Sequence, residues 1–299
     1  MLMLKYSEPL LKGTMTRARL ENILVENIRA SLLSHGVKKY ALAREGGVLL
    51  IEVKNEKRHL AHLSRVFGVN LLLSCEVVPA RMEKIAEKCA RAAQKFKKNS
   101  SFAIRARRVG SHTFSSEDIG RICGAAVQRA RKLTVDLDEA DNEIFVYVRH
   151  EKAYVSTHVI RGPGGLPLGS QGKALALISG GPRSLLAAWM LMRRGCRLVL
   201  LHAKTTAKNK KITRVAGELR KWHIGKNLKL YSLKIQREQL LAIADELARR
   251  TGARGIVVGD DLKGALSRGK TETPLFYPLV AFDDSEVKKM LEKAGVSMR

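Results

Sequence analysis

The sequence predicts a protein of several domains, α+β in its N-terminal half and α/β with a parallel sheet in its C-terminal part. The chain has 299 residues, of which 45% are hydrophobic, and this is enough for two or three separate cores. Residues 161–173 are rich in glycine and proline, so they interrupt regular structure and mark a domain boundary. Beyond them, apolar strands alternate with helices, which is the pattern of a parallel sheet with helices on both faces.

The N-terminal elements follow from the spacing of the apolar residues. Residues 16–35 carry leucine and isoleucine at helical spacing, and Gly36 is a stop signal. A β-rich stretch at 46–53 and a short helix at 59–67 follow, which predicts a small α+β unit. A second unit opens with an amphipathic helix at 80–96.

The strand predicted at 102–109 has a face that carries arginine. Alternation with period two puts apolar residues on one face and Arg105 and Arg107 on the other, and Arg108 breaks the pattern at the end. On a basic protein, such a face is a candidate for phosphate contacts, and a merely solvated face is the alternative.

Further elements complete the second unit and the C-terminal part. Ser115 and Asp118 are spaced as a capping box, which predicts a helix start, and residues 143–150 and 153–160 predict a hairpin. The expected C-terminal strands are 174–179, 197–203, 229–233, 255–261 and 276–280, with helices at 184–194, 238–250 and 285–294 and a basic helical stretch within 204–229.

The charge points to a polyanionic partner. The formal net charge is +27 and the pI is about 10.3, and a surface this basic attracts nucleic acid. A basic surface that serves only solubility is the alternative. No apolar run approaches the roughly 18 to 20 residues that a membrane span needs, and the N-terminus does not resemble a secretory signal, so we expect a cytoplasmic protein with no membrane partner.

The cysteines and histidines do not predict a metal site. Cys75, Cys89, Cys123 and Cys196 form no C-x-x-C pair, so buried thiols are expected in place of a zinc or dithiol motif. His59 and His62 are three residues apart but have no third ligand nearby, and no metal is predicted there.

The segment "ISGGPRS", residues 178–184, predicts a phosphate-binding turn between a strand and a helix. Gly180 and Gly181 let backbone N–H groups approach an anion, the helix N-terminus favours negative charge, and Ser179 and Ser184 add hydroxyl groups. The chain has no G-x-x-x-x-G-K-[ST] motif, so this is not a Walker A loop. A tight turn without a ligand is the alternative.

Longer stretches around this turn resemble one known family. "SGG-x-x-S" after a strand is similar to the PP-loop of ATP pyrophosphatases, and "GGLPLGSQGKALALISGG" with "AAWMLMRRGC" resembles the tRNA 4-thiouridine synthetases. Upstream, "LKYSEPLLKG" with Arg17 resembles the opening segment of that family, and "FAIRARRVGSHTFSSEDIGRICG" resembles its THUMP RNA-binding domain. The similarity runs in order from about Leu4 to Phe282.

The resemblance implies a fold and a reaction. It implies a ferredoxin-like domain at 1–75, a THUMP domain at 76–165 and a Rossmann-like PP-loop domain at 166–299. In that family, ATP adenylates a uracil oxygen of tRNA and a persulfide then displaces AMP. It also implies tRNA as a partner, a homodimer, and ATP with magnesium as cofactors. The positions that fall on RNA-gripping motifs are Lys12, Arg17, Arg105, Arg107, Arg108, His112 and Phe114; those that fall on the nucleotide or phosphate site are Ser179, Gly180, Gly181, Arg183, Ser184 and Asp260.

Departures from the family pattern concern the chemistry. Arg183 stands where the family has Asp, and it cannot ligate magnesium; Asp260 stands where the family has Glu. Residues 228–253 contain no cysteine that could carry a persulfide, and no rhodanese domain is expected. No catalytic residue is assigned.

Three hypotheses follow from the pattern and its departures. The first is a tRNA-binding protein whose adenylation and sulfur transfer are lost or altered, acting alone or with a partner enzyme. The second is an active ATP-dependent tRNA sulfurtransferase that makes 4-thiouridine with an external sulfur donor. The third is an anion or nucleotide sensor in which Arg183 completes the site.

Overall fold

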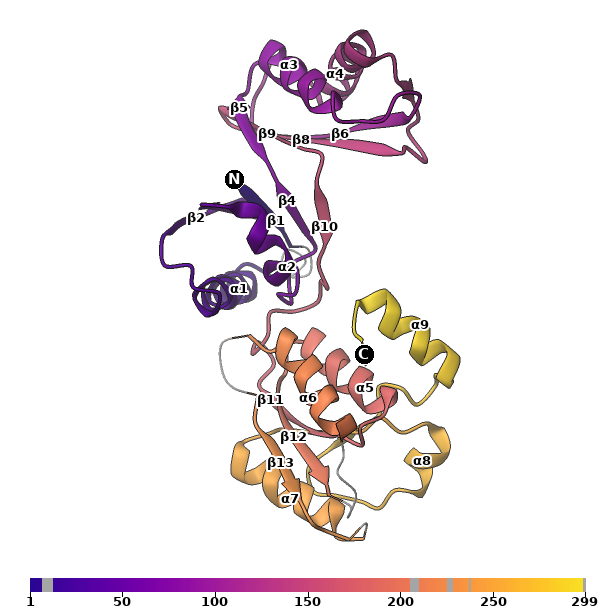
Figure 1. The fold of residues 1–299 in the computed structure, drawn as a ribbon. Helices are drawn as coiled ribbons and strands as arrows, with labels where there is room; N and C mark the ends of the chain where they lie inside the picture. The colour runs from indigo at the N-terminus through magenta and orange to yellow at the C-terminus, as the bar shows by residue number, and fades with distance from the viewer. Residues whose placement is uncertain (7–12, 205–209, 225–227, 237, 298–299) are drawn as a thin grey trace. The chain divides into compact units, whose positions relative to one another are not determined.

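The computed structural model describes residues 1–6, 13–204, 210–224, 228–236 and 238–297 (Figure 1). Within these ranges the chain forms three five-stranded sheets. It divides into two compact units, one of residues 1–4, 39–58 and 71–160 and the other of residues 5–38, 59–70 and 161–299. The predicted combination of α+β folds with a parallel-sheet α/β fold is confirmed.

The first unit holds two sheets. One has the order β10-β4-β1-β3-β2, and the other has the order β5-β9-β8-β6-β7. The strands of the former are β1 (Leu2–Lys5), β2 (Tyr40–Glu45), β3 (Val48–Val53), β4 (Leu71–Ser74) and β10 (Val159–Arg161); those of the latter are β5 (Glu76–Pro79), β6 (Ser101–Val109), β7 (Thr134–Val135), β8 (Asn142–Arg149) and β9 (Lys152–Ser156). The strands β8 and β9 pair antiparallel, which confirms the predicted hairpin.

Helices α3 (Met82–Ala93) and α4 (Ser116–Arg131) pack on the second sheet of this unit. Cys89 and Cys123 lie in their shared core with Phe102 of β6, as the helical and strand periodicities predict. The predicted capping box at the start of α4 is present, because Ser115 and Asp118 each bond the backbone N–H of the other.

The second unit is built on a parallel sheet of order β13-β12-β11-β14-β15. Its strands are β11 (Lys173–Leu177), β12 (Arg197–Ala203), β13 (Leu230–Leu233), β14 (Ile256–Val257) and β15 (Leu275–Phe276). Its helices are α1 (Thr14–Ser34), α2 (Leu60–Leu63), α5 (Pro182–Arg193), α6 (Lys210–Trp222), α7 (Leu240–Thr251), α8 (Leu262–Ser267) and α9 (Asp284–Ala294). A short 3-10 turn, η2 (Glu56–His59), precedes α2.

Alternate residues of β11 face two different cores. Ala174 and Ala176 pack with α5, α6 and α9, whereas Leu175 and Leu177 pack with α7. Since successive side chains of a strand point to opposite faces, this places helices on both sides of the sheet.

Several predicted elements are shorter or different in the structure. The strand predicted at 153–160 ends at Ser156, and the residues after it form β10 in the other sheet. The strand predicted at 255–261 is reduced to β14 (Ile256–Val257), and its expected end leads into α8, which was not predicted. The strand predicted at 276–280 is reduced to β15 (Leu275–Phe276), because Pro278 has no N–H for a sheet. The helix predicted at 59–67 ends at Leu63.

Candidate functional site

A pocket of about 630 Å³ lies at the carboxyl ends of β11, β12 and β14. The neighbours of β11 in the sheet are β12 on one side and β14 on the other, so the order of the strands reverses at this point. In open parallel sheets, ligands bind in the crevice beside such a reversal. The volume is in the range of pockets that hold a nucleotide-sized molecule.

The turn from β11 to α5 forms one wall of this pocket. Gly180 has φ of +84°, and a Cβ there would lie 3.1 Å from Cβ of Lys211. Gly181 is the N-cap of α5 and Pro182 follows it, but no side chain caps the first turn. The backbone N–H groups of this turn therefore remain available to an anion at the pocket.

Two serine hydroxyls brace the turn from within. Ser184 Oγ donates to Gly181 O at 3.1 Å and accepts from the backbone N–H of Ser179 at 3.3 Å. Ser184 is buried, whereas Ser179 is exposed at the mouth of the turn. The Ser179 hydroxyl donates to Ser184 Oγ at 3.2 Å, and it is the exposed one of the two at the pocket.

The chain after β14 approaches the start of α5 very closely. A Cβ on Gly259 would lie 2.7 Å from Arg183 C and from Ser184 N, which are backbone atoms. Only glycine fits at this position without a shift of the helix start.

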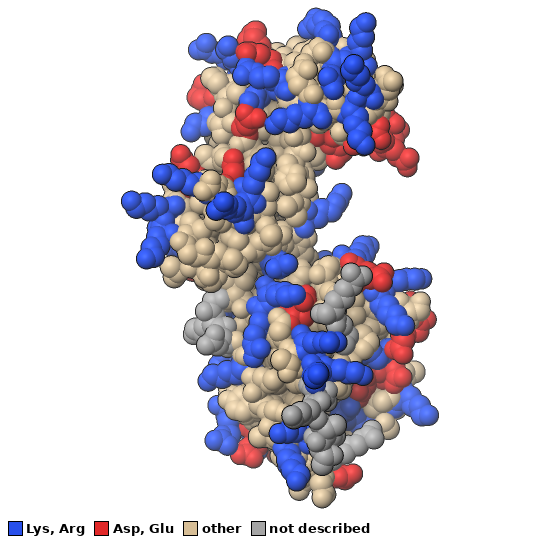
Figure 2. Space-filling model, viewed as in Figure 1, with Lys and Arg blue, Asp and Glu red and all other residues tan. Residues whose placement is uncertain are grey.

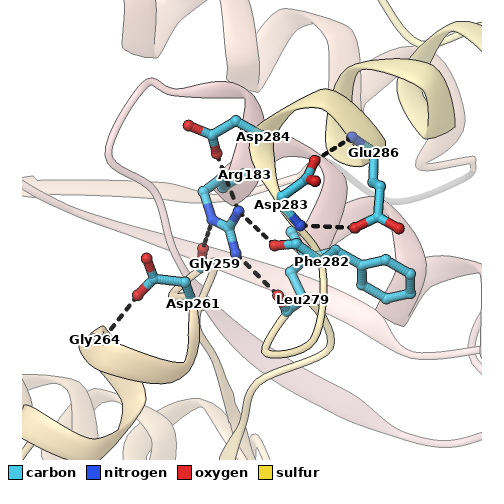
Figure 3. Close-up of polar contacts among 9 residues, drawn as sticks. All are labelled: Arg183, Gly259, Asp261, Gly264, Leu279, Phe282, Asp283, Asp284 and Glu286. Carbon is cyan, nitrogen blue, oxygen red and sulfur yellow. Dashed lines mark hydrogen bonds and ion pairs between the residues drawn. The ribbon is translucent and has the colours of Figure 1, made fainter.

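Arg183 does not extend its guanidinium into the pocket as a free cation (Figure 3). Its Nε donates to Gly259 O at 2.9 Å and its Nη2 to Leu279 O at 2.9 Å. Its Nη1 donates to Phe282 O at 3.1 Å and pairs with Asp284 at 3.1 Å. Through these bonds, Arg183 joins the loop to the segment before α9. Its side chain is only 20% exposed.

Each acidic side chain that lines the pocket has a partner within the protein. Asp260 pairs with Arg268 at 2.5 Å, and Asp261 accepts from the N–H of Gly264 at 2.8 Å as the N-cap of α8. Asp284 pairs with Arg183. Nowhere in the described part of the chain do three or more His, Cys, Asp or Glu side chains gather as metal ligands. The residues present fit a phosphate group, and each carboxylate of the pocket is already engaged by a donor of the protein.

His202 is a pocket residue that the sequence analysis missed. It is 5% exposed, its Nδ1 lies 3.0 Å from Ile178 O, and its Nε2 has no hydrogen-bond partner within the described part of the chain. Since a carbonyl only accepts, Nδ1 donates to Ile178 O, and Nε2 is the nitrogen that is left for a ligand. Its place at the carboxyl end of a buried parallel strand is the signal that would have indicated it.

No thiol lines the pocket, although all four cysteines lie in described residues. Cys75, Cys89 and Cys123 are buried, and Cys196 is partly buried. Burial raises the pKa of the Cys196 thiol, which opposes formation of the reactive thiolate.

In the first unit, the predicted RNA-binding residues differ in their surroundings. Arg107 is exposed, whereas Arg105 pairs with Glu143 of β8 at 2.6 Å. Arg108 donates to Gly110 O at 2.5 Å, on the face opposite to Arg107. Figure 2 shows Lys and Arg spread widely over the face it draws, in agreement with the net charge.

The remaining predicted RNA-binding residues are spread over both units. His112 Nε2 lies 2.7 Å from His150 O, and Phe114 packs partly against the core of α3 and α4. Arg17 belongs to the other unit, in α1, where it pairs with Glu21 at 2.8 Å. Lys12 lies outside the described residues.

Three family models match successive parts of the chain. A ThiI ferredoxin-like domain matches residues 1–72, a THUMP domain matches residues 79–158, and a thiamine biosynthesis protein (ThiI) model matches residues 169–239.

Solved structures share the fold. A crystal structure from Pyrococcus horikoshii superposes with a TM-score of 0.81 at 26% identity and covers 99% of both chains. A 4-thiouridine synthetase crystallised with RNA and bound ATP gives a TM-score of 0.79 at 23% identity, covering 98% of this chain and 84% of the other.

Relatives with known names agree along the whole length. A probable tRNA sulfurtransferase of Methanosarcina mazei is 32% identical, covering 97% of this chain and 81% of that protein. One from Saccharolobus islandicus is 29% identical, covering 95% and 83%. On these matches, together with the parallel sheet and its glycine turn, the chain belongs to the tRNA sulfurtransferase (4-thiouridine synthetase) family.

Proposed function

We propose that this protein is a tRNA-binding member of the family that holds a nucleotide phosphate in its pocket and has lost or altered adenylation and sulfur transfer. The observation that carries the proposal is the state of Arg183. The guanidinium of Arg183 places a positive charge in the loop. Its N–H groups donate to three carbonyl oxygens and to Asp284.

The pairing of the acids supports the loss of the metal-dependent step. Activation by ATP needs a magnesium ion beside the triphosphate, and such an ion prefers free carboxylate and water oxygens. Here Asp260 is neutralised by Arg268 and Asp284 by Arg183. A metal would have to displace an arginine from either of these two carboxylates, and the third, Asp261, already accepts from the N–H of Gly264 through one oxygen. The pocket therefore favours phosphate binding over metal-assisted transfer.

The thiols support the change in sulfur transfer. A persulfide carrier must reach the activated base, and the four cysteines lie away from the pocket. Sulfur delivered to this site would therefore come from a separate donor.

RNA binding is supported by charge and by the relatives. The net charge of +27 matches a polyanion, and the exposed Arg107 on β6 is free to contact phosphate. The related 4-thiouridine synthetase was crystallised with RNA and ATP, and its fold is shared along almost the whole chain. We propose that this protein also binds RNA and ATP, and that its RNA is a tRNA.

An active sulfurtransferase that uses an external donor is the second candidate. The open first turn of α5 and the unused Nε2 of His202 favour it, since both offer groups to a nucleotide in the pocket. A sensor in which Arg183 completes an anion site is disfavoured, because the donors of Arg183 are already engaged.

ATP–pyrophosphate exchange, measured with and without an unmodified tRNA transcript, separates the two candidates. We expect tRNA to bind without exchange and without thiolation, even when a persulfide donor is supplied. Robust exchange would overturn the first candidate in favour of the second.

The RNA-binding face is tested by the double substitution Arg105→Ala and Arg107→Ala. We expect tRNA affinity to fall roughly tenfold or more and the salt dependence of binding to flatten by about two ions. The matched control, Lys84→Ala with Arg91→Ala on α3, removes two exposed cations from the same unit. Equal effects of the two pairs would rule out a specific role for β6.

A further inference from the structure

A second pocket, of about 890 Å³, lies at the other end of α5 from the nucleotide pocket. Residues 64–70, the glycine-rich segment at 161–165, the C-terminal half of α5 and the end of α9 surround it. All of these segments belong to the second compact unit. Neither the family resemblance nor the proposed chemistry gives this pocket a role.

The walls of the pocket are held together by backbone hydrogen bonds. The N–H of Gly68 donates to Gly164 O at 2.8 Å, and the N–H of Gly164 donates to Val69 O at 2.8 Å. On the other side, Arg193 Nε donates to Pro163 O at 2.9 Å. The glycine-rich segment is thus fastened to both walls, so the cavity is formed before any ligand arrives.

Two glycines allow this close assembly. A Cβ on Gly162 would lie 2.3 Å from Val69 O, and a Cβ on Gly165 would lie 2.2 Å from Arg193 O. Both contacts are with backbone atoms that cannot turn aside, so only glycine permits these walls to meet.

The floor of the pocket is apolar and carries one unsatisfied donor. The floor is lined by Leu186, Met190, Trp189 and Trp222. The two indole rings meet edge to face, with 5.5 Å between their centroids. Trp189 is 5% exposed, and its buried Nε1–H has no acceptor among the residues that the structure describes. A buried indole N–H normally finds a partner, so this one points to a ligand that supplies an acceptor.

The rim of the pocket is cationic. Arg65, Arg161, Arg193 and Lys293 line it with a single acid, Glu292. Among the described residues, the side chains of Arg65, Arg161 and Lys293 form no hydrogen bond or ion pair, and Arg193 uses only Nε. These cations come from separate segments, so they surround the opening and can meet charge on more than one side.

We infer that this pocket receives one unstacked nucleotide of a bound RNA. The base lies on the apolar floor with a carbonyl oxygen or ring nitrogen accepting from Trp189 Nε1, and its flanking phosphates meet the cationic rim. A lipid would need a longer apolar lining, and an acidic peptide would not use the aromatic floor. The inference rests on the tRNA binding proposed above and adds a contact on the α/β unit.

Intrinsic fluorescence reports on the surroundings of this pocket, because both tryptophans of the chain line it. We expect emission to change as unmodified tRNA, or a short single-stranded RNA, is titrated into the full chain. The change should follow the same binding curve as a gel-shift assay. Unchanged emission at saturating tRNA would overturn the inference.

The indole N–H is tested by Trp189→Phe, which keeps an aromatic ring and removes the donor. We expect RNA affinity to fall roughly fivefold, the loss for one hydrogen bond. Unchanged affinity contradicts the inference.

The cationic rim is tested by Arg161→Glu with Lys293→Glu, against the same reversal at Arg249 and Arg250 on α7. We expect a larger loss of RNA affinity from the rim pair. Titration with AMP tests for a mononucleotide site. If tryptophan emission responds to AMP as strongly as to RNA, and this response is lost in Trp189→Phe, the inference is overturned in favour of a mononucleotide site. Absence of any tRNA binding in the parent protein would refute the proposed function, whereas binding without a response from this pocket refutes only the inference.

Discussion

The two helices α4 and α5 begin in opposite ways. At the start of α4, Ser115 Oγ accepts from the N–H of Asp118 at 3.0 Å, and Asp118 accepts from the N–H of Ser115 at 2.9 Å. At the start of α5, Gly181 offers no side chain and the first turn opens on a pocket. One helix satisfies its terminal donors with its own residues, and the other leaves them for a ligand.

The difference extends to the charge beside each helix start. A carboxylate at α4 complements the positive end of the helix dipole. At α5 the first turn contains Arg183, which is unfavourable there unless other groups offset it. Three carbonyl oxygens and Asp284 provide that compensation. The comparison indicates that α4 is closed for stability, whereas α5 is kept open and braced from outside.

The largest effect is expected from Arg183→Asp, the reversal toward the family residue. It would leave Gly259 O, Leu279 O and Phe282 O without donors and place a carboxylate beside them and near Asp284. Uncompensated buried polar groups of this kind cost about 3 kcal/mol of unfolding free energy. Urea unfolding followed by fluorescence would measure the loss.

Asp284→Asn is the control for this change. The Asp284 side chain is 79% exposed, so its ion pair contributes at most about 1 kcal/mol, and its loss should be small. If the Arg183→Asp protein is as stable as its parent and also gains ATP–pyrophosphate exchange, then the loop does not need the hydrogen bonds of Arg183.

Gly259→Ala tests how tightly the open helix start is enclosed. The added Cβ would meet Arg183 C and Ser184 N at 2.7 Å, so we expect a cost of about 2 kcal/mol and a weaker thermal shift on adding ATP. Gly217→Ala in α6, where no atom lies within 4 Å of the new Cβ, should be neutral or stabilising by about 0.5 kcal/mol. Similar losses at both positions would contradict the close approach.

Sequence periodicity predicted most of the fold because the elements bury one face or both. The strand β11 and the helices α3 and α4 follow the expected spacing of apolar residues. The helix α8 escaped prediction because none of its residues is buried, with Leu262 58% and Leu266 79% exposed. Its start depends on local capping by Asp261, which apolar periodicity does not reveal.

The site residues stay a prediction, but the sequence identified the contiguous part of the pocket and missed the parts that come from elsewhere in the chain. The glycine turn at 178–184 is one motif, and all of its residues except Gly180 line the pocket. The acceptors of Arg183 and the unused nitrogen of His202 come from other strands and loops. The parallel sheet brings these segments together, so no short stretch of sequence contains them.

Ser115→Ala is expected to cost about 1 kcal/mol, the usual loss for an N-cap side chain. The change removes the acceptor for the N–H of Asp118. The first turn of α4 then lacks a side-chain cap, like the first turn of α5. The neighbouring Ser116→Ala is the matched control, since Ser116 lies within the helix and contributes no cap. Thermal unfolding of the two variants measures the difference, and equal midpoints would mean that α4 gains nothing from its closed start.

The smallest effect is a difference in acid sensitivity between the two helix starts. Hydrogen bonds from Ser115 and an ion pair with Arg121 lower the pKa of Asp118 below its ordinary value of 3.8. A lowered folded-state pKa gives stability that is present above the unfolded value and is lost as pH falls through the folded one. The first turn of α5 contains no carboxylate, so no residue of that turn gives such a step. The parent protein should therefore lose more stability between pH 5 and pH 3 than Ser115→Ala does, as measured by urea midpoints at both values. Parallel losses in the two proteins would show that Asp118 draws no pH-dependent stability from the capping box.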